Sequence, residues 1–376
     1  SLESYFNAIN KKYTLSKLTS RADSARLPSV TIIDMKREFE KAKGFTNFSD
    51  KLIEGLKIRM EKGEQSILFL NRRGYHTSLL CQHCGQTVKC KDCDLSLTFH
   101  LGDNTLACHL CGYTISPPPK ECPQCAHANP LKFRGVGTEL IEKSLHALLP
   151  GIRTIRMDAD TTRHKGSHQK LLKAFSSGKA DVLIGTQMIA KGLHFPSVTL
   201  VGVLNCDASL NIPDFRASEV VFQLITQVSG RAGRGQIPGE VFLQTSIPDH
   251  STIVLAASHD YDKFVEEELK IRQMFNYPPY TNMIKVSFSG ADQKATYAYS
   301  NHVRTYLMQR LPHGFEWHEV IPAGYVKVKG QFRYQFLARG SSIYAFSEVM
   351  GEFVKEQGPT KKFKMRIDVN PSSTFF

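Results

Sequence analysis

The sequence has no apolar run long enough to cross a membrane, although 41% of its 376 residues are hydrophobic. It opens without a hydrophobic targeting segment, and it shows no internal repeat or low-complexity tract. These absences exclude a membrane-spanning chain and a solenoid. We therefore expect a cytoplasmic protein with no membrane partner, whose thiols stay reduced and whose length suggests more than one domain.

A second absence concerns nucleotide binding. Nothing in the sequence matches G-x-x-x-x-G-K-[ST], the loop whose backbone N–H groups and lysine hold nucleotide phosphates. If this chain takes part in nucleotide chemistry, we expect the loop to come from another domain.

Cysteine, by contrast, is present in an ordered pattern, because eight of the nine cysteines form C-x2-C pairs between residues 81 and 125. Two such pairs supply the four thiolates of one tetrahedral Zn2+ site, so the pattern predicts two structural zinc ions with no open coordination position. A disulfide framework is the less favoured alternative, since cytosolic thiols stay reduced. The pairs are Cys81/Cys84, Cys90/Cys93, Cys108/Cys111 and Cys122/Cys125.

The four pairs can combine in three ways. From Cys90 to Cys111 the spacing is C-x2-C-x14-C-x2-C, close to that of a single zinc ribbon, which favours an inner site nested within an outer one. Combining the first pair with the second is possible but cramped, and a crossed arrangement is the remaining alternative. Nesting would bring residue 81 next to residue 125, so that the segment projects from its host domain on a neck.

The charge is strongly basic, with 48 Lys and Arg against 35 Asp and Glu and a formal net charge of +13. Two zinc ions bound by eight thiolates would reduce this to about +9. A charge of this sign indicates a polyanionic partner, nucleic acid first, although basic proteins are also often merely soluble.

Short apolar strands alternate with helices through the first two thirds of the chain, as in a parallel, doubly wound α/β sheet. The residues before the first helix are interpreted as irregular. We expect a discontinuous domain at 1–80 and 126–258, a zinc-binding insertion at 81–125 and a separate C-terminal α/β domain at 259–376. Strands are predicted at 66–70, 152–157, 181–185, 198–204 and 240–244, and helices at 51–62, from about 138, at 168–177 and at 217–228.

Three stretches at the ends of these elements contain polar and basic residues. They are candidate binding residues, because ligands bind beyond the carboxyl ends of the strands in parallel sheets. The stretches are 71–74 (N-R-R-G), 185–192 (G-T-Q-M-I-A-K-G) and 227–235 (Q-V-S-G-R-A-G-R-G). The last has two arginines, each preceded by glycine. Guanidinium suits phosphoryl oxygens because it is planar, always charged and bidentate.

Here the residues resemble a known family. Q-V-S-G-R-A-G-R is similar to the Q-x-x-G-R-x-G-R motif of superfamily-two helicases. The closer resemblance is to the PriA family of bacterial replication-restart helicases, whose second motor lobe carries L-F-L-N-R-R-G, a four-pair cysteine insertion, G-T-Q-M-x-A-K-G-x-x-F-P and G-R-A-G-R. All occur here in that order, at 68–74, 81–125, 185–196 and 230–234, and a D-V-x-P element is present at 368–371.

The resemblance implies the C-terminal half of an ATP-dependent, 3′-to-5′ DNA helicase of the bacterial cytoplasm, with a RecA-like second lobe. The sequence has no D-E-x-H box for Mg2+, and its opening residues 1–5 resemble the segment directly after the motif that closes the first lobe. We therefore expect a DNA-binding region and the first lobe to precede this chain. ATP with Mg2+ would bind between the lobes, and this half alone would be inactive.

The resemblance also implies roles for individual residues. Arg231 and Arg234 would reach the nucleotide, with Arg234 as arginine finger, and Gln227 would orient groups nearby. Thr186 and Lys191 would contact the backbone of the tracking strand. Other candidates have plainer alternatives: Arg72 and Arg73 are phosphate contacts or a solvated rim, and Thr138 begins a helix that holds a DNA phosphate or is an ordinary cap.

In the C-terminal domain, Lys327, Lys329 and Arg333 alternate with aromatic residues. Strand alternation places Phe332, Tyr334 and Phe336 on one face and Arg333 on the other. Two interpretations are evenly balanced on the residues alone: an apolar face packed in the core beside a solvated basic edge, or a contact with the DNA backbone. The resemblance favours DNA.

The implied partners are forked and single-stranded DNA, primosome proteins, single-stranded-DNA-binding protein and a replicative helicase loader. Two alternatives belong to other classes. One is a zinc-ribbon DNA-binding or scaffold module that recruits replication proteins without turnover. The other is a different superfamily-two enzyme, such as an RNA helicase or a translocase that remodels forks.

Overall fold

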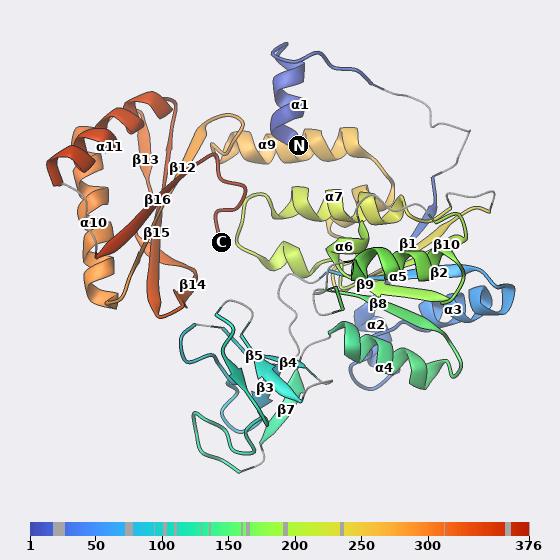
Figure 1. Cartoon of the computed structure of the whole chain (residues 1–376). Coiled ribbons are helices and arrows are strands. Elements are labelled where there is room, and N and C mark those ends of the chain that lie inside the picture. The colour runs from blue at the N-terminus through green and yellow to red at the C-terminus, as the bar shows by residue number, and fades with distance from the viewer. Residues whose placement is uncertain are drawn as a thin grey trace.

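The computed structural model describes residues 1–17, 27–71, 78–93, 95–100, 104–108, 111–128, 130–134, 137–158, 161–162, 166–190, 195–233, 237–311, 313–357 and 362–375. These residues form a large α/β body, a cysteine-rich insertion that projects from it, and a smaller C-terminal body (Figure 1). The predicted α/β class with an inserted cysteine segment is confirmed.

The large body is built on a six-stranded sheet of order β1-β11-β10-β2-β9-β8, in which all neighbours are parallel. Three central strands, β2, β9 and β10, are buried along their whole length, as expected when helices cover both faces. The strands are β1 (Ser29–Asp34), β2 (Gln65–Leu70), β8 (Thr154–Met157), β9 (Val182–Gly185), β10 (Val198–Leu204) and β11 (Glu240–Thr245).

The sheet has a separate core on each face, because the side chains of successive strand residues point to opposite faces. In β2, Ile67 and Phe69 enter one core, and Leu68 and Leu70 enter the other. The first core is covered by α1 (Leu2–Ile9), α5 (Ser167–Ser176), α6 (Gln187–Ala190), α7 (Ala217–Ser229), α8 (Ser251–Ala257) and α9 (Tyr261–Met274). The second is covered by α2 (Met35–Lys41), α3 (Asp50–Lys62) and α4 (Thr138–Leu148).

Helix α3 illustrates how the local sequence sets an element. The Ser49 side chain accepts a hydrogen bond from the N–H of Leu52 at the start, and Gly63, at φ 68°, ends the helix in the left-handed conformation. Leu52 and Leu56, one turn apart, are buried against the sheet. The sequence predicts this helix to within one residue.

The beginning of the chain differs from the prediction. The interpretation of these residues as irregular is wrong, because they form α1, β1 and α2. Strand β1 lies at the sheet edge and pairs with β11 from Ser29↔Glu240 to Asp34↔Thr245. An edge strand is only half-buried, and its partner lies far along the chain, so no continuous apolar run marks it.

The insertion leaves the large body on a two-stranded antiparallel neck, β3 (Ser78–Cys81) with β7 (Leu131–Arg134). Beyond the neck lies a small antiparallel sheet of β4 (Thr98–His100), β5 (Thr105–Ala107) and β6 (Thr114–Ile115). The core of the insertion contains cysteines together with Leu97, Phe99 and Leu106, so the paired cysteines also contribute to packing.

The C-terminal body (residues 282–375) has an antiparallel sheet of order β13-β15-β12-β16, with β14 also paired to β15. Helices α10 (Gln293–Arg310) and α11 (Ile343–Gln357) pack on one face of it. The strands are β12 (Asn282–Gly290), β13 (Phe315–Trp317), β14 (Ile321–Val328), β15 (Gln331–Gly340) and β16 (Phe363–Val369).

Helix α9 packs with the large body, which changes the predicted boundary of the C-terminal domain. Its side chains Phe264, Val265 and Leu269 belong to the core of the large body, whereas the separate core of the C-terminal body begins with Ile284. We therefore propose a boundary after α9, rather than at residue 259. Among the helices in the described ranges, none combines the length and apolar character that a membrane span requires.

Candidate functional site

The eight paired cysteines come together in two groups of four. The inner cluster contains Cys90, Cys93, Cys108 and Cys111, and the outer cluster contains Cys81, Cys84, Cys122 and Cys125. Within each cluster all sulfur atoms lie within 4.8 Å of one another. The nested pairing is therefore confirmed, and the cramped and crossed alternatives are excluded.

The sulfur spacing fits a tetrahedral metal site. Cys81 Sγ lies 3.7 Å from Cys125 Sγ, Cys84 Sγ lies 3.7 Å from Cys122 Sγ, and Cys90 Sγ lies 3.5 Å from Cys111 Sγ. Four sulfur atoms each ~2.3 Å from a central Zn2+ lie about 3.8 Å apart. Both donor sets thus match the size and ligand type that zinc requires.

At three of the cysteine pairs the backbone forms a tight turn that brings the two sulfur atoms to the same side. Gly85, Gly112 and Ala126 follow the second cysteine of their pairs with φ of 70°, 81° and 53°. Each donates its N–H to the carbonyl of the first cysteine, at 2.9 Å. Further N–H groups, those of Cys84, Asp92 and Tyr113, point at sulfur atoms from 3.4 to 3.5 Å. Such donors stabilise thiolate, the form that binds metal.

Individual thiols differ in acidity for physical reasons. Burial raises the pKa of Cys90 to about 12, whereas backbone N–H groups of Cys125 and Gln124 lower the pKa of Cys122 to about 7. A bound zinc ion would hold every coordinating cysteine as thiolate.

A second group of polar residues lies at the carboxyl edge of the parallel sheet. Asn71 follows β2, Asp158 follows β8 and Thr186 follows β9, and all three are buried. Since these strands are parallel neighbours, their ends lie at one edge. Thr186 is therefore presented at the edge where the sequence places it, while Lys191 lies outside the described residues, as do Arg72 and Arg73.

Asp158 holds the surrounding loop. Its carboxylate forms an ion pair with Arg156 at 2.9 Å and accepts hydrogen bonds from the Thr161 N–H at 2.9 Å and the Thr138 hydroxyl at 2.6 Å. The cap of α4 is Gly137, so the interpretation of Thr138 as an ordinary cap is wrong. A DNA contact at Thr138 stays a prediction.

Helix α7 carries the third stretch to the opposite edge of the sheet. After this helix the Gly233 N–H donates to the carbonyl of Val198, the first residue of β10, at 3.0 Å. A helix that follows a strand runs back along it, so the arginine motif lies at the amino edge, away from Thr186. Gln227 is exposed and Arg231 is half-buried. Arg234 lies outside the described residues.

The two edges are connected on one face of the sheet. Helix α6 follows Thr186 directly, and its Ile189 is buried in the same core as Leu224, Val228 and Ala232 of the α7 region. The stretch after β9 therefore packs beside the helix that leads into the arginine motif. Sequence reasoning missed this arrangement because it compared element ends without the direction of each helix.

Gly233 allows the chain to turn at the arginine motif. Its φ is 68°, and a Cβ at this position would lie 2.4 Å from the Gly239 backbone nitrogen. Glycine is thus required both by the left-handed conformation and by the close approach of two backbone segments.

We expect Gly233→Ala to lower the free energy of unfolding by at least ~1–2 kcal/mol, the cost of a left-handed alanine, with the backbone clash in addition. Gly230→Ala is the matched control, because its Cβ would lie 3.5 Å from the Thr226 carbonyl oxygen, an ordinary contact. Urea unfolding followed by circular dichroism measures both variants. Equal midpoints and slopes would contradict the requirement for glycine at 233.

The basic turn of the C-terminal body lies against the inner cysteine cluster. Lys327 Nζ donates to the Lys91 carbonyl at 3.4 Å, the Lys329 N–H donates to Cys93 Sγ at 3.3 Å, and the Gly330 N–H donates to the Asp92 carbonyl at 2.8 Å. These contacts join β14 and β15 to the insertion. No sequence signal predicted them, since two backbone donors carry most of the contact.

Arg333 lies on the sheet face opposite the helices. In the register of the sheet it pairs with Ser289, which pairs in turn with Lys364, and the three line one cavity of about 920 Å³. The predicted alternation is confirmed, because Tyr334 and Phe336 are buried in the core on the other side. Burial and the nearby Arg366 lower the pKa of Arg333, so cationic groups crowd this face.

Three protein-family models match separate parts of the chain. Residues 90–115 match the PriA DNA helicase Cys-rich region domain, residues 135–236 match the helicase conserved C-terminal domain, and residues 273–372 match the primosomal protein N C-terminal domain. The matches follow the same order as the insertion, the large body and the C-terminal body.

Curated relatives match over the whole length. The replication restart protein PriA of Chlamydia trachomatis serovar D is 47% identical over 376 residues, covering 100% of this chain and 50% of the relative. That of Bacillus subtilis strain 168 is 41% identical over 375 residues, covering 98% and 46%. That of Haemophilus influenzae is 35% identical over 372 residues, covering 99% and 50%. The chain spans about half the length of the curated relatives it matches.

Proposed function

Because the chain belongs to the PriA family of replication restart proteins, we propose that it is the C-terminal half of an ATP-dependent, 3′-to-5′ DNA helicase that recognises forked DNA and starts primosome assembly. The observation that carries this proposal is the order of the motifs. Asn71, Thr186 and the arginine motif follow one another around one parallel sheet, and the cysteine insertion leaves the chain between the first two.

In this proposal the large body forms one wall of an ATP site. A first lobe supplies the loop and the Mg2+ ligands that hold the phosphates. Arg231 and Arg234 face that site, with Arg234 stabilising negative charge on the transferring phosphoryl group, and Gln227 orients groups beside them. The left-handed turn at Gly233 fixes the backbone of the motif up to that residue.

The carboxyl edge of the sheet contacts the DNA strand along which the protein moves. Thr186 and Lys191 hold the backbone of the tracking strand, and Arg72, Arg73 and Thr138 add phosphate contacts from neighbouring strand ends. Because α6, which follows Thr186, packs beside α7, closing the ATP site moves the contacts with the DNA strand as well. The two cysteine clusters bind structural zinc, and the insertion they stabilise contacts partner proteins and divides the duplex at the fork.

The face of the C-terminal body that carries Arg333 provides a further DNA contact. We expect Arg333→Ala/Lys364→Ala to weaken binding of forked DNA and to reduce the slope of log K against log salt by about 1.4–1.8, since each lost phosphate contact removes ~0.7–0.9. Fluorescence anisotropy at several salt concentrations measures both quantities.

The control for this pair is Lys294→Ala/Lys355→Ala, which removes the same charge from exposed positions on α10 and α11. If both double variants weaken binding equally, the effect is one of net charge, and the sheet face is not the contact. Lys327 and Lys329 are left intact, because their turn also contacts the insertion.

ATP hydrolysis by the protein that carries both lobes tests the proposed function. We expect turnover that forked DNA stimulates and RNA does not. Hydrolysis stimulated by RNA would indicate a different superfamily-two enzyme. DNA binding without hydrolysis would indicate the scaffold module, in which primosome proteins, single-stranded-DNA-binding protein and the helicase loader are recruited without turnover.

A further inference from the structure

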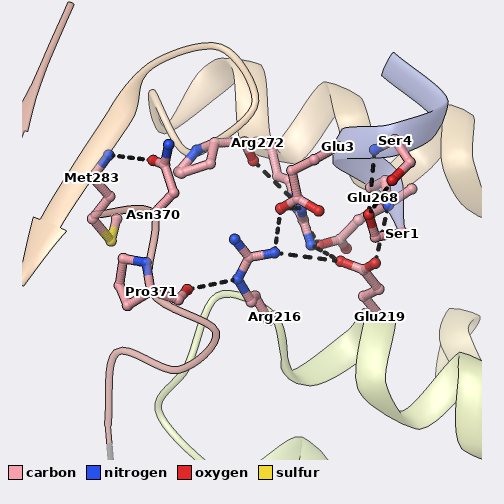
Figure 2. A network of polar contacts seen from close by, with 12 residues as sticks. Ser1, Glu3, Ser4, Arg216, Glu219, Glu268, Arg272, Met283, Asn370 and Pro371 are labelled. Carbon is pink, nitrogen blue, oxygen red and sulfur yellow. Dashed lines mark hydrogen bonds and ion pairs between the residues drawn. The ribbon is translucent and has the colours of Figure 1, made fainter. Parts of the chain in front are cut away.

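A buried cluster of charged residues lies where α1, α7 and α9 meet, and the proposed function gives it no role. This charge cluster consists of Glu3, Arg216, Glu219, Glu268 and Arg272 (Figure 2). The Arg272 side chain is 0% exposed. Burying charge is costly unless each group is paired, so a cluster that only filled space could be replaced by apolar residues at little loss.

Arg272 is paired on every side. Its guanidinium donates to Glu219 Oε2 at 2.7 Å, to Glu268 Oε1 at 3.1 Å and to Glu3 Oε1 at 3.2 Å. Three carboxylates face two guanidinium groups, and burial raises the pKa of Glu268. Glu219 is a residue of α7 and also accepts the Leu2 N–H at 3.0 Å.

Two connections lead from the charge cluster toward the C-terminal body. Arg272 donates at 3.4 Å to the carbonyl of Pro278, in the segment that joins α9 to β12. Arg216, which precedes α7, pairs with Glu3 and donates to the carbonyl of Pro371, just after β16, at 3.1 Å. Asn370, at φ 48°, accepts the Met283 N–H at 3.0 Å and so fixes the turn that presents Pro371 (Figure 2).

Two stacked aromatic rings with arginines on both sides make a third connection. Arg339 of β15 lies 5.2 Å from the Tyr277 ring, which stacks on Phe215 at 4.9 Å. On the Phe215 ring lie Arg272, at 5.2 Å, and Arg216, at 4.7 Å. Cation–π contacts of this kind are directional and gain strength where water is excluded. The start of α7 is thus held to the C-terminal sheet by polar and aromatic contacts alike.

The far end of the same helix leads into the arginine motif. Helix α7 has 13 residues and includes Gln227 in its last turn, and Arg231 follows after Gly230. An α-helix of this length is a stiff rod of about 20 Å. A shift of the C-terminal body that moves Pro371 or Arg339 therefore changes the position of the arginine motif at the other end.

We propose that Arg272 and Arg216 are positioning residues that couple DNA bound to the C-terminal body to the placement of the arginine motif beside ATP. This inference rests on the proposed function for its two ends, DNA and ATP. The contacts that carry the coupling, those of Arg216 and Arg272, do not depend on that function.

The test uses the protein that carries both lobes and compares Arg272→Gln, Arg272→Lys and Arg216→Gln with wild type. Hydrogen–deuterium exchange of residues 227–233 is measured with and without forked DNA, beside ATP hydrolysis and DNA affinity. We expect DNA to slow exchange in this segment of the wild type. In both Gln variants we expect that response to disappear and the stimulation of hydrolysis by DNA to fall at least tenfold, with DNA affinity within threefold. Arg272→Lys, which keeps the charge, should recover part of both.

Arg310→Gln is the matched control, because Arg310 belongs to the C-terminal body and pairs there with Glu356, away from the charge cluster. If Arg272→Gln does not fold, Arg216→Gln decides, since Arg216 is 13% exposed and its loss buries less unpaired charge. An unchanged exchange response in the folded Gln variants would overturn the coupling. If the wild type hydrolyses no ATP but its exchange response is lost in these variants, the coupling stands and the proposed function fails.

Discussion

Replacing Arg234 with alanine in the protein that carries both lobes is expected to lower DNA-stimulated ATP hydrolysis by roughly 10³-fold or more, the effect of an arginine finger in nucleotide hydrolases. Arg234 follows Gly233, whose left-handed turn and contact with Gly239 fix the backbone directly before it. ATP and DNA binding should change little, because the guanidinium acts mainly on charge that develops during phosphoryl transfer. Steady-state hydrolysis with and without forked DNA measures the loss.

Arg37→Ala is the control for this experiment, since the Arg37 side chain is 81% exposed and pairs with Asp34 at 3.5 Å. We expect it to keep wild-type hydrolysis. If Arg234→Ala lowers hydrolysis by less than tenfold, Arg234 is not the arginine finger, and Arg231 becomes the candidate. A parallel loss of DNA binding would indicate instead that the motif contacts DNA.

Replacing Cys93 with serine is expected to remove the inner zinc ion alone, so that the bound metal falls from two ions per chain to one. Structural zinc sites contribute on the order of 10–16 kcal/mol of apparent binding free energy, and much of the insertion core is made of the ligands themselves. We expect the inner part of the insertion to become sensitive to protease. Metal analysis and limited proteolysis measure the two effects.

Cys206→Ala is the matched control, because Cys206 is buried within the large body and belongs to neither cluster. It should keep two zinc ions. Cys122→Ser should remove the outer ion and loosen the join between residues 81 and 125. Loss of both ions from Cys93→Ser would show that the two sites fold as one unit, contrary to the independent clusters expected here.

The central part of the fold is predictable from the sequence because it depends on local patterns. Buried runs such as 66–70 and 198–204 mark parallel strands, and the C-x2-C spacing from Cys90 to Cys111 identifies the inner cluster. The edge strand β1 is different. It is half-buried, and among the described strands it pairs with β11 alone. Its residues 30–33 are all β-branched, which favours a strand, but nothing within the segment indicates that its partner is β11, far along the chain.

The charge cluster shows why other features escape sequence reasoning. Glu3, Glu219 and Arg272 resemble ordinary surface residues of helices, and only the packing of α1 on α7 and α9 brings them together. One signal was available, because Glu219 lies between apolar residues of a helix that is otherwise buried on that side. Placement of the arginine motif at the amino edge likewise depends on helix direction rather than on composition.

The turn at Lys329 and Gly330 links the docking of the C-terminal body on the insertion to zinc binding by the inner cluster. The Lys329 N–H donates to Cys93 Sγ of the inner cluster, so the docked turn and the zinc ion proposed for this cluster act on the same sulfur atom. Binding equilibria that share an atom are reciprocal: if zinc favours docking by a given factor, docking raises zinc affinity by that same factor. In that case a partner that pulls the turn away from the insertion would also lower zinc affinity, and chelation would weaken this one contact of the C-terminal body with the insertion.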